Sequence, residues 1–323
     1  TAGVAEVGSD YFDMRLLSVW AVAMNFSYRG YWNGINRSGV YMRTLVITHV
    51  ANVIFSYGLI FGAWGLPALG GAGAGLGTSL ALYLGSALYL LQTWRAAREH
   101  GFLRARPSRA TLRNILRISL PNGVQQFFFA TGLTVLFWII GRVGADEVAV
   151  AHILITLILF LILPAIGLGL SAASLVGQAL GRRDADDAYR WGWDVTRLAV
   201  SLLFVLALPM WLVPDLILGL FLKQPALVEL GRAPLMITGL AICLDGVAII
   251  FTQALLGAGA ARSVMVVTLA VQWFFFLPLA YIIGPVLGYG LLGIWLAQAF
   301  QRLITSLLLS GLWIKRGWAH IEL

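Results

Sequence analysis

Long apolar segments recur along the whole sequence and constrain its fold more than any other feature. About 20 apolar residues in a helix span the hydrocarbon core of a bilayer, so runs of roughly 18 or more predict membrane-crossing helices. Several runs, such as 148–170, are apolar nearly all round, whereas a helix of a soluble protein keeps a polar face. The sequence therefore predicts an all-α, polytopic helical membrane protein. The expected spans are nine, at about 13–34, 42–62, 70–95, 114–141, 147–180, 191–220, 231–257, 263–285 and 288–314.

The basic residues gather at alternate ends of these expected helices. Membrane proteins keep an excess of Lys and Arg in cytoplasmic loops, so the richer side is expected to be cytoplasmic and to hold the C-terminus. The net charge of +8 then reflects topology, and we expect no nucleic-acid partner. The richer side holds Arg29, Arg37, Arg43, Arg95, Arg98, Arg104, Arg106, Arg109, Arg113, Arg117, Arg182, Arg183, Arg190, Arg197, Arg262, Lys315 and Arg316, and the other side Arg15, Arg142, Lys223 and Arg232.

An internal repeat predicts how the helices are organised. Segment 28–62 can be laid over 251–284 with small gaps, so that Gly34 meets Gly257 and Gly62 meets Gly284. The repeat implies a parent of twelve helices in two parallel six-helix lobes, of which this chain lacks the first three. Residues 1–95 are then the last three helices of the first lobe, 96–112 a cytoplasmic linker, and 113–323 the second lobe.

Five local strings in a fixed order resemble one family of transporters. They are "SLPNGVQQFFF" (119–129), "VAVAHILI" (148–155), "LVGQALGRRDADDAYR" (175–190), "LDGVAIIFTQALLGAGAARS" (244–263) and "QWFFFLPLAYIIG" (272–284). Together with the repeat and the topology, they resemble the seventh to eleventh helices of the multidrug and toxic compound extrusion (MATE) family. The resemblance covers essentially the whole chain.

This resemblance implies export of bulky, often cationic compounds in exchange for H⁺ or Na⁺ across a bacterial inner membrane, by alternating access of two lobes. In one branch of the family, the acid that matches Asp245 belongs to a cation site. The chain departs from that branch at Phe129, where an acid is expected, and at Ala241, where a tyrosine is expected. We expect a small-molecule substrate, the bilayer as surroundings, a monomer, and no cofactor besides the coupling ion.

Asp245 is also a candidate on physical grounds. It lies about fifteen residues into an apolar helix, with no basic residue nearer in sequence than Arg232 and Arg262, whereas the other acids lie at helix ends, in loops or at the termini. Charged side chains in membrane helices are costly and usually have a function or a partner. We expect Asp245 to be a proton- or cation-coupling site, and the alternative is a structural hydrogen bond to a neighbouring helix.

Further polar residues inside helices are candidates to line a substrate cavity. For each, interhelical hydrogen bonding or anchoring at the membrane interface is the alternative. The candidates are Gln125, Gln126, Gln253, Gln272, Trp273 and Tyr281 in the second lobe, and Asn52 and Tyr57 in the first.

Other classes of protein fit the sequence less well. A flippase for lipid-linked oligosaccharides needs several intramembrane basic residues, and Arg302 is the one plausibly placed. Membrane enzymes need paired acids, HExxH or a Ser/Lys set, and ATP-driven pumps need a P-loop; neither pattern occurs. A channel or structural subunit is a further alternative. The single Cys243 is expected to be a packing thiol, and the acids at 184, 186 and 187 a solvated charge run rather than a metal site.

Overall fold

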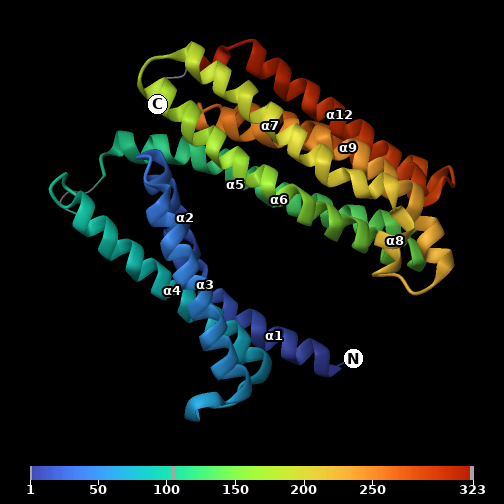
Figure 1. The fold of residues 1–323 in the computed structure, drawn as a ribbon, viewed down its shortest axis with the longest axis horizontal. Coiled ribbons are helices and arrows are strands. Elements are labelled where there is room, and N and C mark those ends of the chain that lie inside the picture. The colour runs from blue at the N-terminus through green and yellow to red at the C-terminus, as the bar shows by residue number, and fades with distance from the viewer. Residues whose placement is uncertain (1, 104–106, 321–323) are drawn as a thin grey trace. The chain divides into compact units, whose positions relative to one another are not determined.

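The computed structural model describes residues 2–103 and 107–320, and these residues contain helices and no strand. Figure 1 shows the course of the chain. The helices are α1 (Ala2–Leu16), α2 (Val19–Gly34), α3 (Ser38–Phe61), η1 (Ala63–Gly65), α4 (Gly70–Ala97), α5 (Arg109–Gly141), α6 (Ala145–Gly181), α7 (Ala185–Leu212), α8 (Pro214–Gly219), α9 (Pro225–Gly257), α10 (Ala261–Leu269), η2 (Ala270–Phe276), α11 (Leu277–Tyr281), η3 (Ile282–Val286), α12 (Gly290–Ile314) and η4 (Gly317–His320).

Eight of these helical stretches are long and apolar enough to cross a membrane, within the residues that the structure describes. They match the expected spans from 42–62 onward. The expected span 13–34 differs, because the helix is interrupted at Leu17 and Ser18 and leaves α1 with 15 residues and α2 with 16. At the interruption, the Ser18 hydroxyl donates to the carbonyl of Arg15 at 2.7 Å. This bond offers the backbone an alternative to the regular helical pattern, as serine often does.

The chain divides into two compact units, Thr1–Pro107 and Ser108–Leu323. The boundary falls inside segment 96–112, which the sequence analysis assigned to a linker. In the first unit, α4 packs against α1, α2 and α3. A Cβ on Gly77 of α4 would lie 2.7 Å from the backbone nitrogen of Ser56, and one on Gly75 would lie 2.6 Å from the carbonyl oxygen of Tyr11. Small residues of this kind let membrane helices approach closely.

In the second unit, α9 packs against α6, α7 and α12. Figure 1 shows α7, α9 and α12 running side by side. The core is apolar: Leu154, Leu235, Ile294 and other buried side chains fill one end, and Phe251, Leu309 and Trp313 belong to the other. Cys243 is half-buried and packs against the cluster of Ala165, Leu203, Ala207 and Ile242. Its position is that of a packing thiol.

The span that follows α9 is irregular. Between Ala261 and Val286 the helix passes through two π-helical turns, η2 and η3. Pro278 lies just after the first turn and Pro285 within the second. Proline removes one hydrogen bond of the α-helical ladder, and π-turns readjust that ladder locally. Gln272 and Trp273, two of the candidate cavity residues, lie in the first π-helical turn.

A candidate ionic site between α9 and α12

Asp245 of α9 forms an ion pair with Arg302 of α12. Atom Nη1 of Arg302 lies 2.8 Å from Oδ2 of Asp245, and the side chains are 10% and 19% exposed. Both residues lie in helices of membrane-spanning length. The ion pair gives each charge an opposite charge in contact with it, which an isolated charge inside a membrane helix would lack.

A second polar contact joins the same two helices one heptad earlier. The indole N–H of Trp295 donates to the hydroxyl of Thr238 at 2.9 Å, across a separation of 57 residues. Asp245 and Arg302 have the same separation, so α9 and α12 run parallel and in one register. A seven-residue interval returns to nearly the same helix face, because 3.6 residues make one turn. The register that holds Trp295 opposite Thr238 therefore also places Arg302 opposite Asp245.

The hydroxyl of Thr238 is itself held in place. It donates to the carbonyl of Pro234 at 2.9 Å while accepting from Trp295. Both Thr238 and Trp295 are buried, at 1% and 2% exposed. A fully satisfied buried pair of this kind fixes the rotation of α9 against α12.

The apolar surroundings of Asp245 along the sequence predict that it needs a partner, but they do not indicate which one. The basic residues nearest in sequence are Arg232 and Arg262, whereas the partner, Arg302, belongs to α12. The available signal was that Arg302 is a basic residue in the interior of an apolar helix, as Asp245 is an acidic one. Two opposite charges inside membrane helices usually pair with each other.

Gln272 and Trp273 contact the backbone of α5. The Gln272 amide lies 3.5 Å from the carbonyl oxygen of Phe129, and the indole nitrogen of Trp273 lies 3.3 Å from that of Phe128. Gly132 leaves the space for the Gln272 side chain, since a Cβ there would overlap its amide nitrogen. In this structure, Gln272 and Trp273 thus connect η2 to α5.

The other candidates of the second unit are dispersed. Gln126 is exposed, and Gln125 is half-buried with its Oε1 atom enclosed and without a hydrogen-bond partner among the described residues. The side chain of Gln253 packs over Gly169 of α6. Tyr281 stacks on Trp138, with ring centroids 6.0 Å apart, and the guanidinium of Arg142 lies over the Trp138 ring at 4.8 Å. Such an aromatic and cationic group is typical of a membrane interface.

Asn52 and Tyr57 lie on α3 of the first unit. Asn52 is half-buried, whereas Tyr57 is 53% exposed and belongs to an aromatic group with Phe61 and Trp64. Because they lie in the other unit, the structure does not relate them to the ion pair.

The acidic run after α6 is engaged in local contacts. Asp184 caps α7 by accepting from the backbone N–H of Asp187 at 2.9 Å, and Asp187 pairs with Arg182 at 2.8 Å. Asp186 pairs with Arg316 at 2.5 Å, which connects the start of α7 to the end of α12. Among the residues described, no group of three or more His, Cys, Asp or Glu side chains is arranged to hold a metal ion.

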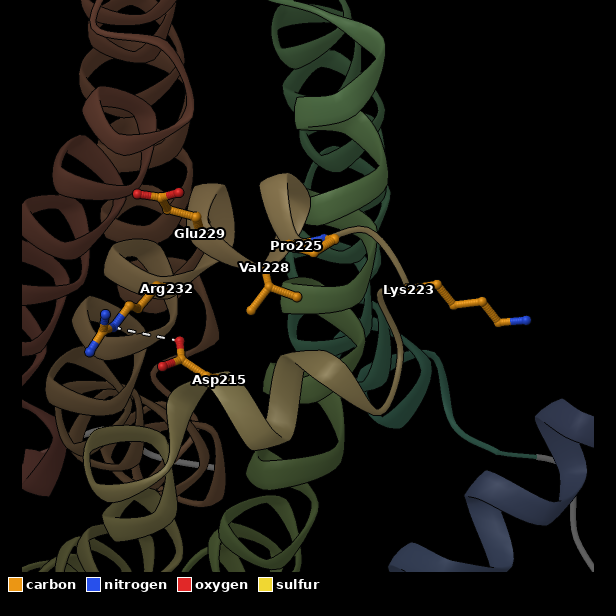
Figure 2. A pocket seen from close by; sticks show the side chains of 6 residues that line it. All are labelled: Asp215, Lys223, Pro225, Val228, Glu229 and Arg232. Atoms are coloured by element: carbon orange, nitrogen blue, oxygen red, sulfur yellow. Dashed lines mark ion pairs between the residues drawn. The ribbon is translucent and has the colours of Figure 1, made fainter.

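A surface pocket lies at the N-terminal end of α9 and is shown in Figure 2. Asp215 of α8 and Arg232 of α9 face each other there with 3.6 Å between their charged atoms, and both are 58% exposed. Lys223 extends away from the others. Exposed pairs of this kind contribute little, so the pocket is a weak candidate for function compared with the buried pair.

The described part of the chain is thus a polytopic α-helical membrane protein with a buried ion pair between two parallel helices. It belongs to the MatE family, whose pattern matches residues 121–282, about half of the chain. Members of this fold have been solved as transporters. The chain's relatives are accordingly transporters and not enzymes.

Two relatives and one solved structure show the extent of the similarity. A probable multidrug resistance protein NorM of Thermotoga maritima is 28% identical over 312 residues, which cover 91% of this chain and 66% of that protein. Its counterpart in Pseudomonas aeruginosa is 31% identical over 277 residues, or 83% and 57%. The chain therefore spans less than two thirds of the length of these relatives. The crystal structure of MATE in complex with MaD3S matches with a TM-score of 0.86 at 18% identity, covering 98% of this chain and 70% of that one.

Proposed function

We propose that this chain works in a secondary active exporter of organic, chiefly cationic compounds. The observation that carries the proposal is the intramembrane carboxylate of Asp245 in a chain of the MatE family. A carboxylate inside the membrane attracts cations, and a protein that binds them from alternate sides carries them across. Entry of H⁺ or Na⁺ down its gradient supplies the free energy for export. Export is coupled to this entry because the ion and the exported cation compete for the same negative charge.

The proposed arrangement has two lobes that alternate between inward-open and outward-open forms. Residues 1–95 would belong to the first lobe and 113–323 to the second, with 96–112 between them. In the second lobe, Gln125 and Gln126 are the most promising substrate contacts, since the Oε1 atom of Gln125 is buried without a hydrogen-bond partner among the described residues and Gln126 is exposed. Gln253, Gln272, Trp273 and Tyr281 would then position helices, and Asn52 and Tyr57 would serve the first lobe.

The proposed location is a bacterial inner membrane, with the C-terminus in the cytoplasm. The distribution of Arg and Lys supports this orientation. Both relatives named above come from bacteria.

A lipid-linked oligosaccharide flippase is a weaker candidate. Such a protein needs free intramembrane cations to hold a pyrophosphate. Arg302, the basic residue on which that reading depends, is already neutralised by Asp245. This contact favours the exporter.

Ethidium efflux from cells that carry the completed gene, with all twelve expected helices, tests the proposal. Native protein should lower ethidium accumulation, and a protonophore or the removal of Na⁺ should abolish the effect and thereby identify the coupling ion. Asp245→Asn should export less at equal expression. The exposed Asp215→Asn variant is the matched control, because it removes an acid from the same unit outside the buried site. Accumulation that is equal with and without the native gene would refute the proposal.

A further inference from the structure

The ion pair between α9 and α12 uses little of the binding capacity of its two groups. An Arg guanidinium carries five N–H donors and a carboxylate has two acceptor oxygens, and the strongest pairs are bidentate. Here atom Nη1 of Arg302 lies 2.8 Å from Oδ2 of Asp245. Within the described residues, this is the single ion pair of either side chain, and neither side chain takes part in a hydrogen bond.

The pair is nevertheless buried within a bundle of membrane-length helices. Arg302 keeps 10% of its side-chain exposure and Asp245 keeps 19%. An ionised group at this depth requires a counter-charge. Because Arg302 supplies it, Asp245 does not need a cation from solution in this conformation.

One negative charge can neutralise only one cation. The sequence places no other acid in the interior of α9, since Glu229 lies near its start, and α12 contains none. A free cation that reached Asp245 while Arg302 stayed in place would leave an excess positive charge in the membrane. Occupancy by Arg302 and occupancy by a free cation are therefore mutually exclusive.

We propose that Arg302 is the resident cation of the Asp245 site, and that a cation from solution binds Asp245 only by displacing the Arg302 guanidinium. This inference rests on the proposed function, because it specifies how the same acid meets its cation. Arg302 is a positioning residue in this scheme: it sets the affinity of Asp245 for cations without touching the exported compound. An ion pair without a hydrogen bond suits this role, since it is released more easily than a bidentate, hydrogen-bonded pair.

Equilibrium binding of ethidium to the purified chain in detergent, at mildly alkaline pH, tests the inference. Arg302→Met removes the competitor, so ethidium affinity should rise by about tenfold or more, as expected from the loss of a charge in contact with the carboxylate. Arg302→Lys keeps the charge but loses the planar guanidinium, so the ethidium affinity of this variant should rise by less than that of Arg302→Met. Asp245→Asn combined with either change should return the affinity to the native level.

Arg232→Met is the matched control. It removes an arginine of α9 in the same way, but from an exposed position far from Asp245, where the side chain is 58% exposed, so it should leave ethidium affinity unchanged. Affinities of the Arg302→Met and Arg302→Lys variants equal to that of native protein would overturn the inference, as would a gain that persists with Asn at 245. If Arg302→Met does not fold, the Lys variant with and without Asp245→Asn decides the question alone.

Binding and export separate the two proposals. Native protein that exports ethidium, with no gain of affinity in the Arg302 variants, overturns the inference alone. If Arg302 variants show an Asp245-dependent gain of ethidium affinity but the native protein does not export ethidium, the proposed function is overturned. The inference that Arg302 is the resident cation then still stands.

Discussion

Trp295 and Thr238 are hydrogen-bonded across 57 residues of sequence, and Arg302 and Asp245 are paired across the same interval. The two contacts lie one heptad apart on parallel helices. The register of α9 against α12 is thus fixed twice, once by a neutral hydrogen bond and once by an ion pair. A shift of one helix by a single residue would break both, so the site and the packing of the second unit depend on each other.

Removing one charge of the pair should destabilise the protein more than removing both. Asp245→Asn leaves a buried guanidinium unpaired, which costs about 3–5 kcal/mol in comparable sites. The double variant Asp245→Asn with Arg302→Met contains no unpaired charge and should recover much of that loss. Thermal unfolding in detergent measures both, and additive losses in the double variant would contradict the coupling.

Gly257→Ala should loosen the packing of α6 against α9. A Cβ at this position would lie 2.8 Å from Cα of Ala173 and would also overlap its carbonyl oxygen. The helices would have to separate, at a cost of about 1–3 kcal/mol as for other overpacked sites. Gly167→Ala on α6 is the control, because nothing lies within 4 Å of its Cβ position. Equal unfolding temperatures for the two variants would show that the close approach has no energetic weight.

Trp273→Phe should weaken the contact between η2 and α5. The change removes the indole N–H that lies 3.3 Å from the carbonyl of Phe128 but keeps an aromatic ring. The expected loss in the free energy of unfolding is about 1 kcal/mol. The neighbouring Phe274 is 86% exposed, so Phe274→Leu should be neutral. If both variants unfold like native protein, Trp273 does not join the helices and returns as a candidate for substrate contact.

Position 223 should lie outside the cell and position 315 inside it, and labelling of cysteines at these positions with a membrane-impermeant maleimide measures this. Lys223 precedes α9 and Lys315 follows α12, so parallel packing places them at opposite ends of the bundle, and both are exposed. Cysteines replace them one at a time in a Cys243→Ser background. Lys223→Cys should react in intact cells, and Lys315→Cys only after permeabilisation. The reverse pattern would place the C-terminus outside.

The membrane class and the family were predictable from the sequence because each rests on local information. A run of about 20 apolar residues predicts a span wherever its neighbours lie, and the five strings stand in a fixed order along the chain. The interruption at Leu17 and Ser18 was not predicted, because a serine that bonds to its own helix leaves the hydropathy of the segment unchanged. The π-helical turns around Gln272 also lacked a signal beyond the two prolines.

The sequence by itself determined that Asp245 is an acid deep in an apolar helix and therefore in need of a partner. The tertiary structure decided which partner, since Arg302 is brought to Asp245 by the register of α9 and α12 that Thr238 and Trp295 share. It also placed Gln272 and Trp273 against the backbone of α5, although their residue types suit a cavity equally well. The physical reason is common to these cases. Hydropathy is a property of a segment, whereas neutralising a charge or satisfying a donor depends on what another helix brings within about 3 Å.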